Sequence, residues 1–225
     1  MGYTTTFEGA FTVSGNLTVD LIQYINRFNY CRHTAVDVER FKAEVPDYED
    51  YGFNGDLGSC GEFIIYDAFD HKHMNELRKG TIDDYNPNSV QSFYCRWGFL
   101  DAETCGLLPL HGREKIIQRK IDAGQVVFGW DLSEKFYSYV AWLKHIAAVF
   151  LEPSGVKLNG VVLATGEDLD DARYIVANNN DILAIDAFEF PGIKEILESF
   201  CSREEVSRIF RTPEELLHRY DCYRR

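Results

Sequence analysis

The chain has 225 residues and a formal net charge of −13, and 45% of its residues are hydrophobic and 14% aromatic. This much apolar surface excludes an intrinsically disordered chain, and the length suits one sizeable core. The acidity disfavours nucleic-acid binding, which needs a positive surface toward the phosphates, and suits a protein partner with a basic face, although many ordinary proteins are equally acidic.

The cysteines and the apolar segments indicate in which cellular compartment the protein resides. The six cysteines are spread along the chain without the close spacing of a small disulfide scaffold. The first residues lack the pattern of a secretion signal, and no apolar run is long enough to span a bilayer. We therefore expect a reduced, cytoplasmic protein that has no membrane partner.

The first third of the chain predicts a strand, a helix and a loop. Residues 3–13 alternate between apolar and polar side chains, as in a half-buried strand. Thr18 can cap the helix that follows, which has an apolar stripe over residues 21–28. Residues 43–61 are acidic and rich in Tyr and Gly, so we expect a loop there, and residues 63–66 can form a short strand.

The middle of the chain predicts two strands around an insertion. Residues 92–99 and 126–130 are rich in aromatic and β-branched side chains, which favour strands. Residues 105–125 form an insertion between them, and its segment 112–122 is basic and helix-like.

One long amphipathic helix is predicted over residues 133–151, where apolar side chains recur at helical spacing. Asp131 and Glu134 resemble a capping box at its start, with Ser133 as an alternative cap. Trp142 lies on the polar side of the stripe, which favours contact with a partner more than is usual for a tryptophan.

The last third predicts strands followed by helices. Residues 156–164 and 173–185 read as three antiparallel strands with a turn at 178–181. Beyond residue 191 we expect two short helices, the second with Thr212 as cap.

These elements predict an α+β fold, in which a mostly antiparallel sheet packs in two layers against one long amphipathic helix, with additional short C-terminal helices. Residues 1–186 are expected to form a single core domain that carries the 105–125 insertion. Residues 187–225 are expected to be a C-terminal helical extension.

An acidic stretch is a candidate metal site. Glu167, Asp168, Asp170 and Asp171 offer enough oxygen atoms for Mg²⁺ or Ca²⁺. The spacing does not match an EF-hand loop, and a solvated acidic turn between strands is the simpler interpretation. We therefore predict no cofactor and keep Mg²⁺ or Ca²⁺ as an alternative.

Other catalytic and zinc patterns are weak. Cys31 with His33, and His71 with His73, each place two possible zinc ligands on one face of an extended chain, but neither pair has a zinc-site spacing. The sequence contains no nucleophile elbow, Walker loop or Rossmann fingerprint. Whether the protein is an enzyme stays open, and the pattern leans toward a binding protein.

A polar and aromatic pocket for a nucleobase-like ligand is a further hypothesis, with core packing of the aromatic residues as its alternative. The candidate pocket residues are Asp84, Asn86, Trp97, Asp131, Glu134, Lys135 and Asn159.

Short motifs along the chain carry a family resemblance. They are Met1-Gly2-Tyr3-Thr4-Thr5, Asp84-Tyr85-Asn86, Tyr94-Cys95-Arg96-Trp97, Glu134-Lys135-Phe136-Tyr137, Leu158-Asn159-Gly160 and Gly166-Glu167-Asp168. In these motifs, as far as about Asp186, the chain resembles a group of uncharacterised proteins of bacteriophages, bacteria and some large eukaryotic viruses. It departs from that pattern at Pro87, where an arginine is usual, at Leu132 and Ser133, where two glycines are usual, and in the insertion and the C-terminal helices.

The resemblance implies a phage-type accessory protein in the cytoplasm of the host cell, without an established activity. Our preferred hypothesis is a binding protein that inhibits a host process or an anti-phage defence by occupying a host protein or a small nucleotide-like ligand. The alternatives are a small hydrolase of a nucleotide-type substrate, metal-assisted through Glu167 and Asp168, and a structural subunit of a homo-oligomer.

Overall fold

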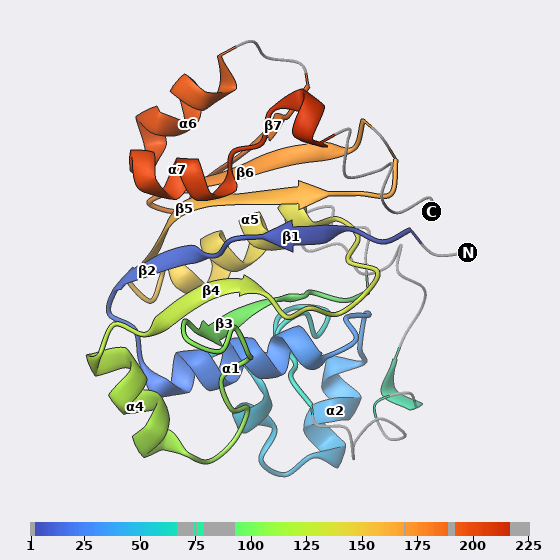
Figure 1. Ribbon diagram of the computed structural model, residues 1–225. Coiled ribbons are helices and arrows are strands. Elements are labelled where there is room, and N and C mark those ends of the chain that lie inside the picture. The colour runs from blue at the N-terminus through green and yellow to red at the C-terminus, as the bar shows by residue number, and fades with distance from the viewer. Residues whose placement is uncertain are drawn as a thin grey trace.

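The computed structural model describes residues 3–66, 74, 76–78, 93–168, 170–188 and 192–216. These residues form helices around a seven-stranded antiparallel sheet (Figure 1). The predicted α+β class with a mostly antiparallel sheet is confirmed.

The order along the chain of the elements that the structure describes is two strands, two helices, two strands separated by a helix, a further helix, three strands and two helices. The strands are β1 (Thr6–Glu8), β2 (Phe11–Gly15), β3 (Trp97–Asp101), β4 (Val126–Trp130), β5 (Val156–Thr165), β6 (Ala172–Asn178) and β7 (Asp181–Asp186). The α-helices are α1 (Val19–Tyr30), α2 (Val38–Glu44), α4 (Glu114–Asp122), α5 (Tyr139–Ile146), α6 (Ile193–Phe200) and α7 (Arg203–Ile209). A 3-10 turn, η1 (Tyr48–Tyr51), follows α2, and a π-helical turn, η4 (Ala147–Leu151), continues α5.

The N-terminal segment lies in the middle of the sheet. The strand order is β3-β4-β2-β5-β6-β7, and β1 also pairs with β5. Thr6 lies opposite Thr165 and Thr12 opposite Asn159, so β1 and β2 keep one register against β5. They are therefore two parts of one strand, interrupted at Gly9, whose φ of 94° no strand residue normally adopts.

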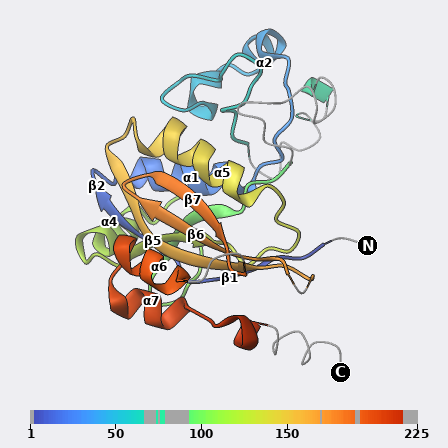
Figure 2. The same cartoon turned by 90° about the horizontal axis from the view of Figure 1, so that it is seen from above.

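Helices cover both faces of the sheet, which differs from the predicted two layers. Figure 2 shows α1 and α5 on one side of the sheet and α6 and α7 on the other. Because neighbouring strand residues point to opposite faces, Val162 and Ile175 join the core under α1 and α5. Leu163 and Tyr174 join a second apolar cluster with Leu197 of α6.

The predicted long amphipathic helix over residues 133–151 is wrong. Its helical part begins only at Tyr139, and α5 has 8 residues before the π-helical turn. The cause is local, because Leu132, Lys135 and Ser138 have φ values of 67°, 60° and 54°, in the left-handed region. A right-handed helix cannot run through such residues, so the apolar spacing there reflects packing rather than helix.

Other local predictions have mixed outcomes. The Leu21 amide donates to the Thr18 hydroxyl (3.2 Å), as the predicted helix cap requires. The predicted turn at residues 178–181 is confirmed, with Asn179 and Asn180 in the left-handed region. Residues 63–66 form no strand, and α2 was not predicted, although Asp37 caps it through the Arg40 amide.

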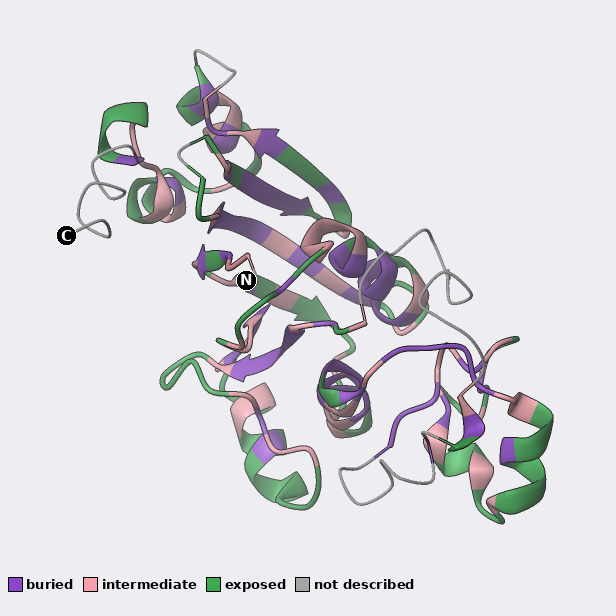
Figure 3. Ribbon diagram, turned by 90° about the vertical axis from the view of Figure 1, so that its right-hand side faces the viewer, coloured by how far each residue is buried: buried purple, intermediate pink, exposed green. Residues whose placement is uncertain are grey.

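Trp142 is buried, so the prediction that it contacts a partner is wrong. Its exposed fraction is 0%, and its ring lies 5.9 Å from Phe28 and 4.9 Å from His33, measured between centroids. The reason is that α1 and the segment after it cover the side of α5 that the apolar stripe leaves polar. Figure 3 shows the buried residues concentrated in the sheet and on the helix sides that face it.

No helix in the part of the chain that the structure describes has both the length and the apolar character needed to cross a membrane.

Candidate functional site

Three segments that are distant in sequence meet at the end of the sheet where the N-terminus lies (Figure 1). The Tyr3 amide donates to the Tyr137 hydroxyl (3.1 Å), and the Tyr3 hydroxyl donates to the Asp171 carboxylate (2.6 Å). The Thr4 amide donates to Glu167 (2.7 Å), and the Asp168 amide donates to the Tyr3 hydroxyl (3.1 Å). We call this network the N-terminal junction, and it joins three of the motifs that carry the family resemblance.

The acidic turn of residues 166–171, between β5 and β6, takes part in most of the hydrogen bonds of this junction. The Asp171 amide donates to the Asp168 carbonyl (3.1 Å), which closes the turn, and Asp171 also lies 3.9 Å from the Arg173 guanidinium. Burial and the hydrogen bond to Asp171 raise the pKa of the Tyr3 hydroxyl above its usual value, so Tyr3 stays protonated and continues to donate. The carboxylates thus bind the N-terminal segment, and within the described ranges no three His, Cys, Asp or Glu side chains are placed to hold a metal ion.

The loop of residues 131–138 is anchored at its start. The Asp131 side chain is only 4% exposed and lies 3.8 Å from the Arg96 guanidinium. Its carboxylate accepts a hydrogen bond from the Ser133 amide (2.8 Å), and the Trp130 indole donates to the Ser133 carbonyl (2.9 Å). Asp131 therefore closes a turn and does not cap a helix, and the predicted capping box is wrong.

This anchored loop exposes large side chains. Leu132 is 65% exposed and Tyr137 is 43% exposed. Tyr94, 37% exposed, lies beside the loop start with the Arg96 guanidinium 4.8 Å above its ring. Left-handed backbone at Leu132 and Lys135 costs about 1–2 kcal/mol for each residue, and such strain is concentrated at functional sites.

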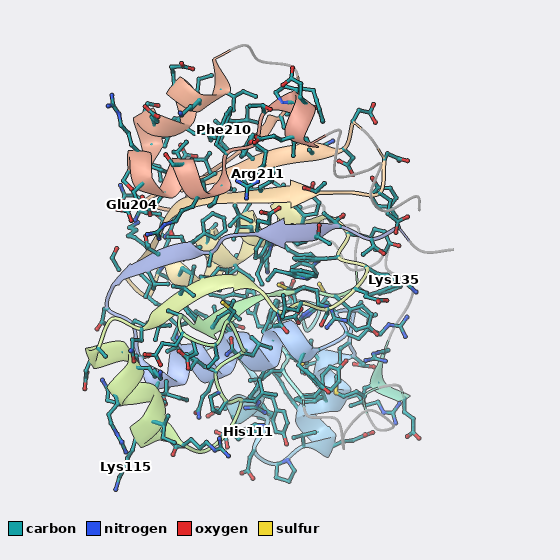
Figure 4. The ribbon with its side chains drawn as sticks, viewed as in Figure 1. His111, Lys115, Lys135, Glu204, Phe210 and Arg211 are labelled. Atoms are coloured by element: carbon teal, nitrogen blue, oxygen red, sulfur yellow. The ribbon has the colours of Figure 1, made fainter. Side chains whose placement is uncertain are left out.

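We call this region the loop surface. It consists of Tyr94, Arg96, Leu132, Glu134, Lys135 and Tyr137. Figure 4 places Lys135 at the same end of the molecule as the N-terminus. Tyr137 links the loop surface to the N-terminal junction through its hydrogen bond with Tyr3.

No family model, curated protein or solved structure matches this chain. The family resemblance accordingly stays an expectation from the motifs.

The predicted pocket residues do not gather around one space. Asp131, Glu134 and Lys135 lie in the loop, but Trp97 is fully buried and its indole donates to the Tyr139 carbonyl (2.7 Å), so Trp97 is a core residue. Asn159 lies near the other end of β5, six residues or roughly 20 Å from Thr165. Its side chain accepts from the Asn179 amide (2.9 Å) and braces the β6–β7 turn.

Two further predicted pocket residues, Asp84 and Asn86, lie outside the described residues, as do His71 and His73 of the second possible zinc pair. Of the first pair, Cys31 is buried and exchanges hydrogen bonds with the Tyr66 backbone. His33 is also buried, and its Nε2 lies 2.9 Å from the Phe28 carbonyl. Both side chains are therefore buried in the core, where they contact backbone carbonyl groups.

A cleft that sequence reasoning missed lies elsewhere on the molecule. Its volume is about 780 Å³, and it is bordered by α1, the segment 49–55 and two turns at 110–111 and 153–154. Figure 4 shows His111, which lines the cleft, well separated from Lys135 of the loop surface. The only signal in the sequence was the acidic, Gly-rich composition of residues 43–61, because the cleft is assembled from distant segments that share no sequence motif.

Proposed function

We propose that this chain is a phage-type accessory protein of the host cytoplasm that binds a host protein and thereby inhibits a host process or a defence system. The loop surface is the part that docks, and the partner presents a basic face. The observation that carries the proposal is an anchored, strained loop that holds Leu132 65% exposed and Tyr137 43% exposed.

The side chains of the loop surface are of the types that dominate binding energy. Tyrosine and arginine are enriched at the energetic centres of interfaces, and the loop surface contains Tyr94, Tyr137 and Arg96. Complete burial of Leu132 in a partner pocket would contribute about 1.5–3 kcal/mol. Because Asp131 already fixes the loop, little conformational freedom is lost on binding.

Charge supports a basic partner. The loop surface itself carries Glu134 together with Arg96 and Lys135. The acidic charge beside it comes from the turn between β5 and β6, where Glu167, Asp168 and Asp170 are exposed, and hydrogen bonds of Tyr3 and Thr4 connect that turn to the loop. The whole chain has a net charge of −13. Such a field speeds the approach of a basic protein and repels acidic ones.

The test compares two exposed leucines. Leu132→Asn removes the apolar side chain and keeps a residue that tolerates left-handed backbone, while Leu183→Asn makes the same change on β7, where Leu183 is 47% exposed. Quantitative capture from a bacterial lysate with the wild-type chain and both variants identifies the partner, and titration then gives the affinities. We expect Leu132→Asn to weaken binding at least about tenfold, or 1.4 kcal/mol, and Leu183→Asn to leave it unchanged.

Equal binding of the captured partner by both variants would show that the loop surface does not dock. Capture of no protein by the wild-type chain would likewise count against the proposal.

A further inference from the structure

The cleft beside α1 has the size of a small-molecule site. Its volume of about 780 Å³ lies within the range of roughly 300–1,000 Å³ that such sites occupy. It uses no residue of the loop surface or of the N-terminal junction, so it is independent of the proposed function.

The cleft combines an apolar floor with a polar rim. Leu21 and Ile65 line it and are 6% and 1% exposed, so they form its floor together with Phe53, whose ring packs 5.1 Å from that of Tyr24. The rim carries carboxylates, because Glu49 and Asp50 line the cleft and are exposed.

The two ends of the rim along α1 carry opposite charges. Asp20 lies at one end and Arg27 at the other, on the same side of the helix and seven residues or about 10 Å apart. Three carboxylates, from Asp20, Glu49 and Asp50, thus line the cleft with one guanidinium.

We propose that this cleft binds an alkylammonium or alkylguanidinium group, as found in a polyamine or in a lysine or arginine side chain. The methylene stem of such a group lies on the apolar floor, and its charged head meets the carboxylates at the rim.

An anionic ligand fits this cleft poorly. The N-terminus of a helix attracts anions, but the Thr18 hydroxyl already accepts from the Leu21 amide, and Asp20 occupies the first turn of α1. A phosphate or carboxylate would also face Glu49 and Asp50 at close range. The three carboxylates therefore favour a positively charged ligand.

The experiment is a titration of the full chain by calorimetry at low salt. One probe is spermidine, and the other is an acetylated and amidated peptide, Gly-Arg-Gly-Arg-Gly. The cleft variant is Glu49→Gln with Asp50→Asn. The matched control is Asp181→Asn with Glu195→Gln, which removes the same charge from the exposed ends of β7 and α6.

We expect saturable binding of at least one probe, weakened about five- to tenfold in the cleft variant and unchanged in the control variant, as the loss of two exposed ion pairs requires. The probe that binds distinguishes a polyamine from a basic protein segment. Equal weakening in both variants would assign the binding to overall charge and overturn the proposal. The absence of saturable binding by both probes would overturn it as well, and thermal unfolding of each variant checks that it is folded.

Discussion

The Tyr3 hydroxyl donates a hydrogen bond of 2.6 Å to the Asp171 carboxylate, across 168 positions of sequence. The same hydroxyl accepts a hydrogen bond from the Asp168 amide, so one side chain fastens the first described residues to the turn between β5 and β6. Tyr137 is joined to Tyr3 as well. These three segments therefore share a structural role, because they hold together the end of the sheet that carries the loop surface.

Tyr3→Phe is expected to lower the free energy of unfolding by about 1 kcal/mol, since it removes both hydrogen bonds of the hydroxyl and keeps the ring. Urea unfolding measures the loss. Tyr30→Phe is the matched control, because Tyr30 is 51% exposed at the end of α1, and it should change the stability by less than about 0.5 kcal/mol. Equal effects of the two substitutions would show that the N-terminal junction contributes little.

The stability should fall as the pH is lowered from 6.5 toward 4. Burial lowers the pKa of His33 to about 3 and that of His145 to about 4, both below the ordinary value of 6.5. The unfolded state therefore binds more protons in this window, and each histidine costs up to about 1.4 kcal/mol of stability per pH unit. Denaturant midpoints at pH 7.0, 6.0 and 5.0 measure the slope.

A stability that is flat over this range in the wild-type chain would contradict the burial of His33 and His145.

Glycine should have opposite effects at two lysines that are close in sequence. At Lys135, with a φ of 60°, glycine relieves left-handed strain, and we expect the stability to stay equal or rise by up to about 1 kcal/mol. At Lys144 inside α5, glycine should cost about 1 kcal/mol. Thermal or chemical unfolding of the two variants gives the comparison, and a loss at Lys135 as large as that at Lys144 would rule out the strained loop.

The C-terminal helices should contribute directly to the stability of the sheet. Leu197 of α6 is fully buried against Val161, Leu163 and Tyr174, so Leu197→Ala should cost about 2–5 kcal/mol. Glu195→Ala on the exposed side of α6 should cost less than about 0.5 kcal/mol. If Leu197→Ala lowers the unfolding free energy by no more than Glu195→Ala, the helices are only loosely attached to the sheet.

The sequence by itself determined the class of the fold and several local elements. The runs of apolar and β-branched residues over 156–164 and 173–185, and the asparagines between β6 and β7, were enough to predict that hairpin, because strand propensity and turn chemistry are local properties. The cap at Thr18 was predicted for the same reason. The local pattern gave a wrong prediction at residues 133–138. The spacing of apolar residues there predicted a helix, but the backbone is left-handed at Lys135 and Ser138.

Only the tertiary structure decided which side chains meet. Tyr3, Tyr137 and Asp171 come together because β1 pairs with the end of β5, and no sequence spacing encodes that pairing. Trp97 was a pocket candidate by its neighbours in sequence, yet strand pairing with Trp130 and the cover of α5 place it in the core. Burial and contact depend on the packing of distant segments, so the candidate site became visible only once the sheet was assembled.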